Sequence, residues 1–262
     1  MGNPPAHRAR KRFGQNFLHD SGVIQQIANA IHPSAEDHLV EIGPGKGAIT
    51  EQLLPACKQL DAIELDRDLL PVLQKRFSEN NDFVLHSADA LKFDFCQLQQ
   101  HQKLRIVGNL PYNISTPLIF HILDKRECIQ DMHFMLQKEV VERLAASPHN
   151  KAYGKLSIMT QVQCQVESLF DIPPHAFDPA PKVQSAFVRL TPRELPLVSS
   201  EQLPAFGKLV TAAFAQRRKT LRNNLKKLVD IEKASGDIDL SLRAENLTIE
   251  NFLTLTRSMS KE

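Results

Sequence analysis

The sequence predicts an α/β protein with a parallel sheet that carries helices on both faces, followed by a small all-helical domain. Apolar runs and helical patterns alternate from residue 39 to about residue 146, as in chains of βαβ units. A glycine-rich segment follows the first apolar run, and the pattern is helical from residue 195 to the end. A length of 262 residues with 42% hydrophobic residues suits one large and one small domain. We therefore expect two domains, residues 1–194 and 195–262.

The first predicted elements form the entry to a nucleotide site. A strand at 38–42 (HLVEI) runs into 43–48 (GPGKGA), and a helix follows at 49–54. Glycines let a ligand approach the backbone, and a helix start offers free N–H groups. The next strand, 60–65, contains Glu64, 21 residues after Gly43, which is the spacing of an acid that holds ribose hydroxyls. A third strand, 83–86, is followed by Asp89, which is able to accept from an adenine amino group.

The fourth predicted strand, 104–107, leads into residues 108–113 (GNLPYN), the most informative stretch of the chain. The side-chain oxygen of Asn109 is able to accept a hydrogen bond from an exocyclic amino group. Pro111 biases Leu110 toward an extended conformation, which turns the Leu110 carbonyl toward the same cleft. Tyr112 offers a ring on which a base stacks. Because the carboxyl ends of parallel strands share one edge, we expect a pocket that grips adenine, the alternative being a simple turn.

The later elements are a helix at 115–123, a strand at 132–136, helices at 138–146 and 155–163, and strands at 166–172 and 186–190. Residues 173–181 (PPHAFDPAP) are too rich in proline to be helical. Phe177 in this loop is either an apolar plug over the sheet or a second stacking face opposite Tyr112, and we favour the second role. Residues 203–228 carry a basic face and an apolar stripe of Phe206, Leu209, Val210, Ala213 and Phe214.

The net charge of +2 conceals two basic segments on an otherwise acidic chain. Residues 1–12 contain Arg8, Arg10, Lys11 and Arg12. Residues 202–229, called the basic segment below, contain no acid and seven basic residues, which are Lys208, Arg217, Arg218, Lys219, Arg222, Lys226 and Lys227. Such asymmetry is typical of nucleic-acid binders. The alternative is a solvated tail and helix face, but concentrated like charge repels itself unless a polyanion binds.

Cysteine and histidine spacing argues against a metal. The four cysteines, Cys57, Cys96, Cys128 and Cys164, are scattered, and we expect them to stay reduced in a cytosol. The ten histidines also lack ligand spacing. No apolar run approaches the roughly 18 residues of a membrane span, and no signal peptide is apparent. We expect a cytoplasmic protein with no metal and no membrane partner.

Two nucleotide chemistries fit the glycine segment. Residues 43–48 also satisfy the dinucleotide fingerprint, so a nicotinamide-dependent oxidoreductase is the alternative for this segment alone. The fourth strand argues against it, because neither His nor Lys stands at its end to handle a substrate proton. The adenine-gripping turn stands there instead.

With these motifs the chain resembles the rRNA adenine dimethyltransferases that use S-adenosylmethionine. The resemblance covers nearly the whole chain and rests on residues 12–18 (RFGQNFL), 40–47 (VEIGPGKG), 64–66 (ELD), 108–117 (GNLPYNISTP), 177–183 (FDPAPKV) and 215–221 (AQRRKTL). It is closest to the bacterial small-subunit branch, whose members methylate two adjacent adenines near the end of the rRNA. The resemblance implies a Rossmann-like class I methyltransferase fold.

The resemblance also implies roles for particular residues. The expected S-adenosylmethionine contacts are Asn16, Leu18, Gly43, Gly45, Glu64, Asp89 and Asn109. The expected catalytic group is Asn109, Leu110, Pro111, Tyr112 and Phe177. The expected RNA contacts are Arg10, Lys11, Arg12, Arg217, Arg218, Lys219 and Arg222. The expected partner is small-subunit rRNA or a pre-subunit particle, bound by a monomer.

Three rival functions stay open at this point. One is a relative that methylates large-subunit rRNA and confers antibiotic resistance. Another is a DNA adenine methyltransferase, for which no target-recognition domain is apparent. The third is a non-catalytic factor in ribosome assembly or RNA binding, against which the complete GNLPYN motif argues.

Overall fold

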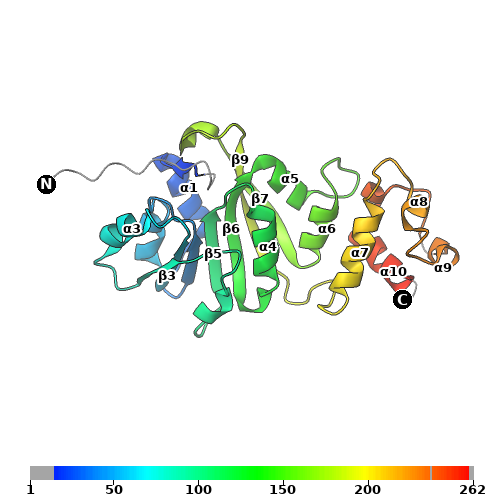
Figure 1. Cartoon of the computed structure of the whole chain (residues 1–262), viewed down its shortest axis with the longest axis horizontal. Coiled ribbons are helices and arrows are strands. Elements are labelled where there is room, and N and C mark those ends of the chain that lie inside the picture. The colour runs from blue at the N-terminus through cyan, green and yellow to red at the C-terminus, as the bar shows by residue number, and fades with distance from the viewer. Residues whose placement is uncertain (1–14, 237, 260–262) are drawn as a thin grey trace. The chain divides into compact units, whose positions relative to one another are not determined.

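The computed structural model describes residues 15–236 and 238–259 (Figure 1). They form two compact units that are not consecutive in sequence. The first contains the chain up to Val141 together with Glu167–Pro192, and the second contains Glu142–Val166 and the chain from Arg193 onward. The chain enters the second unit for the last time at Arg193, close to the domain boundary expected between residues 194 and 195. The expected domain boundary assigned residues 142–166 to the first domain, but in the structure they pack within the second unit.

A seven-stranded sheet in the order β4-β3-β2-β5-β6-β9-β7 organises the first unit. Its strands are β2 (His38–Ile42), β3 (Gln59–Glu64), β4 (Phe83–Ser87), β5 (Leu104–Asn109), β6 (Ile129–Gln137), β7 (Cys164–Ile172) and β9 (Ser185–Pro192). The pairs from β4 to β6 are parallel, and β6 pairs with β9 in the antiparallel direction. The predicted α/β fold with a parallel sheet is confirmed. Strand order reverses between β2 and β5, and such switch points are where ligands bind.

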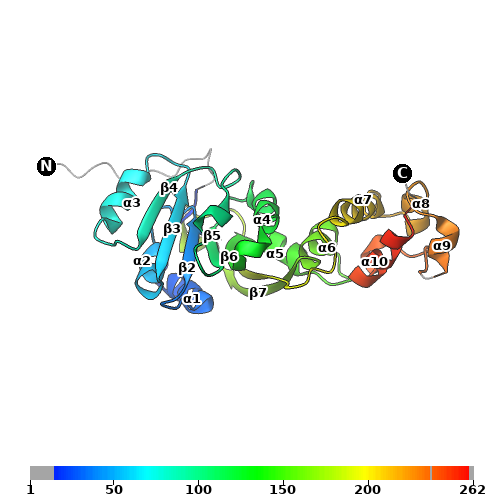
Figure 2. The ribbon, with the colours of Figure 1, turned by 90° about the horizontal axis from the view of Figure 1, so that it is seen from below.

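The central strands are buried on both faces, which explains their nearly continuous apolar sequence. All five residues of β2 are buried, as are the first five of β5. The helices of this unit are α1 (Ser21–Ile31), α2 (Thr50–Leu53), α3 (Leu70–Phe77) and α4 (Ser115–Leu123), while α5 (Lys138–Ala145) begins in this unit and ends in the second. Figure 2 shows α1 and α4 on opposite faces of the sheet. Short 3₁₀ turns cover Leu54–Ala56, Phe95–Leu98, Arg126–Cys128 and Pro174–Ala176.

A second, two-stranded sheet joins parts of the chain that are far apart in sequence. Strand β1 (Phe17–Leu18) pairs antiparallel with β8 (Phe177–Asp178), so that Leu18 stands opposite Phe177. The backbone N–H of His19 also donates to the carbonyl of Ala176 at 3.0 Å. The sequence did not predict this pairing, because two-residue strands carry no periodic signal. It ties the N-terminal segment to the proline-rich loop.

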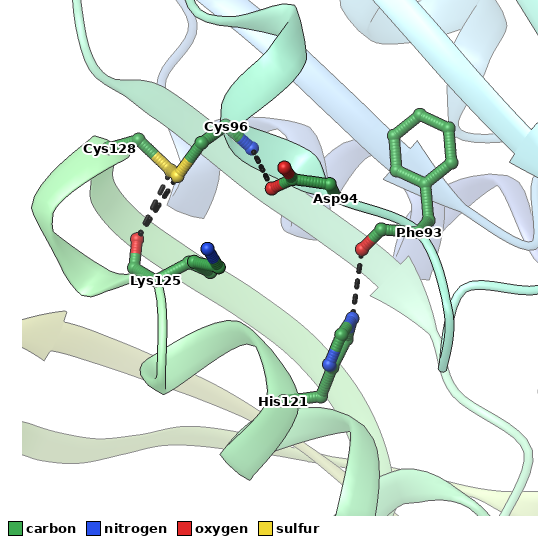
Figure 3. The surroundings of a disulfide bond; sticks show 6 residues. All are labelled: Phe93, Asp94, Cys96, His121, Lys125 and Cys128. Carbon is green, nitrogen blue, oxygen red and sulfur yellow. Dashed lines mark hydrogen bonds between the residues drawn. A yellow bond between two sulfur atoms is a disulfide. The ribbon is translucent and has the colours of Figure 1, made fainter.

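A disulfide joins Cys96 and Cys128, which corrects the expectation that all four cysteines are free thiols (Figure 3). The two residues are 32 positions apart in sequence, with Cα atoms 5.5 Å apart. They lie on the turns before β5 and β6, and these adjacent parallel strands bring both turns to the same end of the sheet. Only the strand order creates this proximity. Cys57 and Cys164 are free.

The second unit is built from helices around its own apolar cluster. Its helices are α6 (Lys155–Gln161), α7 (Leu203–Ala213), α8 (Leu221–Leu225), α9 (Ile231–Ser235) and α10 (Ile249–Arg257), with a 3₁₀ turn at Ala244–Asn246. The predicted apolar stripe is confirmed, since Phe206, Leu209, Val210 and Ala213 of α7 are buried in this cluster. The predicted helical pattern at 203–228 is not one continuous helix, because α7 ends at Ala213, before Arg217, Arg218 and Lys219. The side chain of Asn224 donates to the carbonyls of Ala213 and Gln216 at 2.7 and 3.2 Å.

Candidate functional site

A cavity of about 340 Å³ opens at the carboxyl ends of the parallel strands. Four strand ends and the N-terminal segment contribute its walls. The residues around it are Gln15–Leu18, Glu41–Lys46, Ala48, Ile49, Ile63–Leu65, Leu69, Ala88–Ala90 and Asn109–Ile114. Among the described residues, the structure brings together every residue expected to bind cofactor and every expected catalytic residue except Phe177.

The glycine segment gives the cavity room for a ligand near the backbone. Gly43 and Gly45 adopt positive φ angles of 64° and 58°, a region that other residues avoid because of their Cβ atom. A Cβ on Gly45 would also lie 3.0 Å from the Phe17 ring. The Lys46 ammonium sits 4.7 Å from the centre of the same ring. Phe17 therefore packs directly over the glycine segment.

Two buried carboxyl groups lie at the ends of β2 and β3. Oε1 of Glu64 accepts the backbone N–H of Asp66 at 2.8 Å, and burial raises the pKa of Glu64 above its usual value. Glu41 accepts the Thr50 hydroxyl at 2.6 Å. Burial, opposed by this bond and assisted by the charge of Glu64, raises the pKa of Glu41 to about 7. Glu41 was not singled out from the sequence, although an acid inside an apolar strand was the available signal.

The third acid, Asp89, has a more open setting after β4. It is partly exposed at the cavity wall, and its Oδ1 accepts the backbone N–H of Leu91 at 3.0 Å. That bond belongs to a tight turn which fixes the direction of the carboxylate. The side chain is thus oriented by its own backbone and reaches the cavity.

Asn109 connects the end of β5 to the N-terminal segment. Its Nδ2 donates to the carbonyl of Asn16 at 2.9 Å. This bond identifies which side of the amide is occupied, because the nitrogen is the only donor on the group. None of the described residues donates to Oδ1 of Asn109. The amide oxygen is therefore the end left to accept from a ligand.

Leu110 and Tyr112, which follow Asn109 in the loop, are each held by a hydrogen bond to another strand. The backbone N–H of Leu110 donates to the carbonyl of Met135 on β6 at 3.2 Å, whereas no described donor reaches the Leu110 carbonyl. The Tyr112 hydroxyl lies 3.0 Å from Oγ of Ser185 on β9. Asn109, Leu110 and Tyr112 thus all line one cavity, and their grip on a planar amine stays a prediction. Ser185 was not predicted, since its partner lies 73 positions away.

Phe177 lies outside the cavity in this conformation. It is 3% exposed and packs in the hydrophobic cluster with Phe17 and Leu18. This placement corresponds to the plug rather than to the favoured stacking face. The stacking role stays a prediction, and it requires the ring to leave the cluster.

The predicted RNA contacts divide into two groups. Arg10, Lys11 and Arg12 lie outside the described residues. Arg217, Arg218, Lys219 and Arg222 are exposed in the second unit. Arg217 donates to the carbonyl of Lys151 at 2.7 Å and approaches Glu245 at 3.4 Å. Among the described residues no three His, Cys, Asp or Glu side chains are grouped for a metal ion.

Comparison with known proteins places the chain among RNA-modifying enzymes. A protein of Saccharophagus degradans named ribosomal RNA small subunit methyltransferase A is 59% identical over 256 residues, covering 97% of this chain and 95% of the relative. The Pseudomonas aeruginosa protein of the same name is 54% identical over 257 residues, covering 97% and 96%.

Solved structures support the same placement. The Plasmodium falciparum dimethyladenosine transferase matches with a TM-score of 0.81 and 25% identity, covering 92% of this chain and 98% of that one. The 23S rRNA methyltransferase ErmE shares the fold, with a TM-score of 0.76 and 22% identity over 94% of this chain and all of that one. A family model described as ribosomal RNA adenine dimethylase matches residues 6–261. The chain is therefore a member of the ribosomal RNA adenine dimethylase family.

Proposed function

We propose that this protein transfers methyl groups from S-adenosylmethionine to the exocyclic amino groups of two adjacent adenosines near the end of small-subunit rRNA. The observation that carries this is a pair of acceptors that no described donor uses, Oδ1 of Asn109 and the carbonyl of Leu110, on residues that line one cavity together with Tyr112. Both acceptors match the two hydrogens of an amino group. The names of the relatives favour the small subunit over the large one.

The family and the fold imply a methyl donor of the S-adenosylmethionine type, and the cavity fits one. Glu64 and Asp89 offer carboxylate acceptors for the ribose hydroxyls and the adenine amino group. Gly43 and Gly45 leave space along the backbone, and Asn16 and Leu18 of the N-terminal segment also line the cavity. When bound, S-adenosylmethionine supplies an activated methyl group on a sulfonium, a donor that needs no further activation.

The residues of this chain then act on the nucleophile. The lone pair of the adenine amino nitrogen is delocalised into the ring, which makes the nitrogen a weak nucleophile. Hydrogen bonds to Asn109 and Leu110 favour a pyramidal nitrogen with its lone pair directed away from the acceptors. Tyr112 holds the plane of the base by stacking. Positioning of this kind supplies most of the rate, and no strong base is required because the amino proton becomes acidic once the methyl is attached.

The basic segment is proposed as the main RNA contact. Its exposed cations suit a phosphate backbone, which dominates the affinity of nucleic-acid binders. The partner is small-subunit rRNA or a pre-subunit particle, bound by a monomer. None of the helices in the described part of the chain is long and apolar enough to cross a membrane. We place the protein in the bacterial cytoplasm because rRNA is processed there.

Product mapping tests the proposal directly. Small subunits, large subunits and DNA lacking the modification are incubated with radioactive S-adenosylmethionine, and the labelled nucleosides are separated. We expect dimethyladenosine from small subunits alone, with no label when Asn109→Ala replaces the wild type. Label in the large subunit or in DNA would overturn the proposed substrate. Binding of the RNA without any label would indicate a non-catalytic assembly factor.

A further inference from the structure

A buried serine on strand β9 bonds to the hydroxyl of Tyr112, which lies in the loop after β5. Ser185 is the first residue of β9 and is 2% exposed. Its Oγ lies 3.0 Å from the Tyr112 hydroxyl, which is a normal distance for a hydrogen bond between two hydroxyl groups. Tyr112 itself is partly exposed at the cavity wall. The hydroxyl end of the ring is thus held by a buried residue, while Tyr112 itself lines the cavity.

Ser185 is a rigid anchor because the sheet holds its backbone on both sides of the contact. It stands opposite Gln137 in the antiparallel pair of β6 and β9. The preceding residue, Gln184, accepts the backbone N–H of Lys138 at 2.9 Å. The hydroxyl of Ser185 therefore has a fixed position relative to β6, the strand that also accepts the N–H of Leu110.

The backbone of Tyr112 is fixed separately by a turn. The N–H of Ile114 donates to the carbonyl of Pro111 at 3.1 Å, and the hydroxyl of Ser115 donates to the carbonyl of Tyr112 at 3.3 Å. With the backbone fixed, the ring keeps two side-chain torsions. A hydrogen bond at the phenolic oxygen restricts both, since this atom lies farthest from the backbone.

We propose that Ser185 is a positioning residue for methyl transfer, which orients the Tyr112 ring so that a stacked adenine presents its amino group to Asn109 and Leu110. This inference rests on the proposed function and deepens it. Ser185 acts through Tyr112 and touches neither the base nor the cofactor.

The bond between Ser185 and Tyr112 matters more for the second methyl transfer than for the first. Before the first transfer, the amino group has two hydrogens for the two acceptors. The monomethylated amine has one hydrogen left, so only one of the two acceptors is still used. Stacking on Tyr112 then carries a larger share of the positioning. Loosening the ring should therefore slow the second transfer more and let monomethyladenosine accumulate.

A double-mutant cycle in the full-length protein tests this. Ser185→Ala and Tyr112→Phe each remove one partner of the same bond, and Tyr112→Phe keeps the ring. We expect each variant to slow the first transfer about three- to tenfold, the range for one neutral hydrogen bond, and the second transfer more. The double variant should be no slower than either single one, since all three lack the same bond. Ser185→Thr keeps the hydroxyl and should restore most of the rate.

Single-turnover rates, the ratio of mono- to dimethyladenosine and calorimetric S-adenosylmethionine affinity are measured for each variant. Ser157→Ala is the matched control, because this serine is equally buried and donates to the carbonyl of Arg143 in the second unit. Unchanged product ratios in Ser185→Ala, or additive losses in the double variant, would overturn the inference. So would a loss of cofactor affinity equal to the loss of rate. A wild-type protein that leaves small-subunit RNA unmethylated would instead overturn the proposed function itself.

Discussion

The cavity loop at residues 108–113 and the basic segment at 202–229 both present functional side chains, but they hold them in opposite ways. In the loop, Asn109 donates to Asn16, and Tyr112 bonds to Ser185. In the basic segment, Arg218, Lys219, Arg222, Lys226 and Lys227 extend from an exposed surface. The difference follows from the task, because attack on one methyl group needs fixed atoms. A polyanion instead responds to the sum of many charges at long range.

The largest effect on stability is expected at Phe177, whose buried ring packs in one cluster with Phe17 and Leu18, two residues that line the cavity. Phe177→Ala should lower the free energy of unfolding by about 3–5 kcal/mol, the usual cost of removing a core aromatic ring. Phe177→Leu separates the two roles, since leucine fills most of the volume but has no aromatic face. Retained activity in the Leu variant, measured with melting curves and methylation rates, supports the plug. A Phe177→Leu protein that is stable but methylates RNA slowly would instead support the stacking role.

Asn109→Ala should raise the activation barrier of methylation by about 3–4 kcal/mol, a hundredfold or more in rate. The salt dependence of RNA binding should stay unchanged, which distinguishes the loop from the basic segment. Asn109→Asp should be nearly as inactive, because Nδ2 donates to the Asn16 carbonyl and a carboxylate oxygen there would face another acceptor. Single-turnover assays at saturating cofactor measure both. An Asp variant close to wild-type rate would show that the hydrogen bond to Asn16 is dispensable.

The disulfide gives the first unit a covalent link, and none joins described residues of the second unit. Reduction, or Cys96→Ser, should lower the free energy of unfolding by about 3.5 kcal/mol in the chain-entropy account of a closed loop. The loop spans 32 residues. Cys164→Ser is the control, since Cys164 is free. Thiol counting by mass spectrometry of protein taken from cells comes first, because cytosolic disulfides are rare. Four alkylated cysteines would show that the bond is open there.

Glu41 should make the free energy of unfolding depend on pH. Its pKa rises from 4.5 to about 7 on folding because the carboxyl is buried. The folded state therefore prefers the protonated form, so this stabilisation is complete below pH 4.5 and is lost as pH rises through 7. The change amounts to about 3 kcal/mol at 1.36 kcal/mol per pKa unit. Denaturant unfolding of Glu41→Gln between pH 5 and 7.5 should show a flatter profile, and a profile parallel to wild type would contradict this.

The smallest effect per substituted residue is expected in the basic segment, and it is an effect on RNA affinity. Neutralising Arg217, Arg218 and Arg222 should reduce the slope of log affinity against log salt by roughly one unit for each phosphate that no longer has a cationic partner. Thermal stability and the rate at saturating RNA should stay near wild type, since these side chains are exposed and the hydrogen bond from Arg217 to the Lys151 carbonyl is a surface contact. Filter binding at several salt concentrations measures the slope. An unchanged slope would show that the segment faces solvent only.

Much of the fold was predictable because it depends on local periodicity. The apolar runs at 38–42 and 104–107 became central strands, and the stripe through Phe206 and Leu209 became the buried face of α7. The site motif was predictable too, because strand ends of a parallel sheet share an edge and Asn109 stands directly at one of them. The charge pattern alone located the basic segment.

The sequence alone determined which segments form the seven strands of the main sheet, where the glycine segment bends and which chemistry the turn at 108–113 offers, since these depend on neighbours along the chain. Tertiary structure decided what depends on distant partners. It buried Phe177 against the N-terminal segment, paired Cys96 with Cys128, and fixed which end of the Asn109 amide is free. Each of these interactions spans at least 32 residues, and no local pattern encodes a partner that only strand order brings into reach.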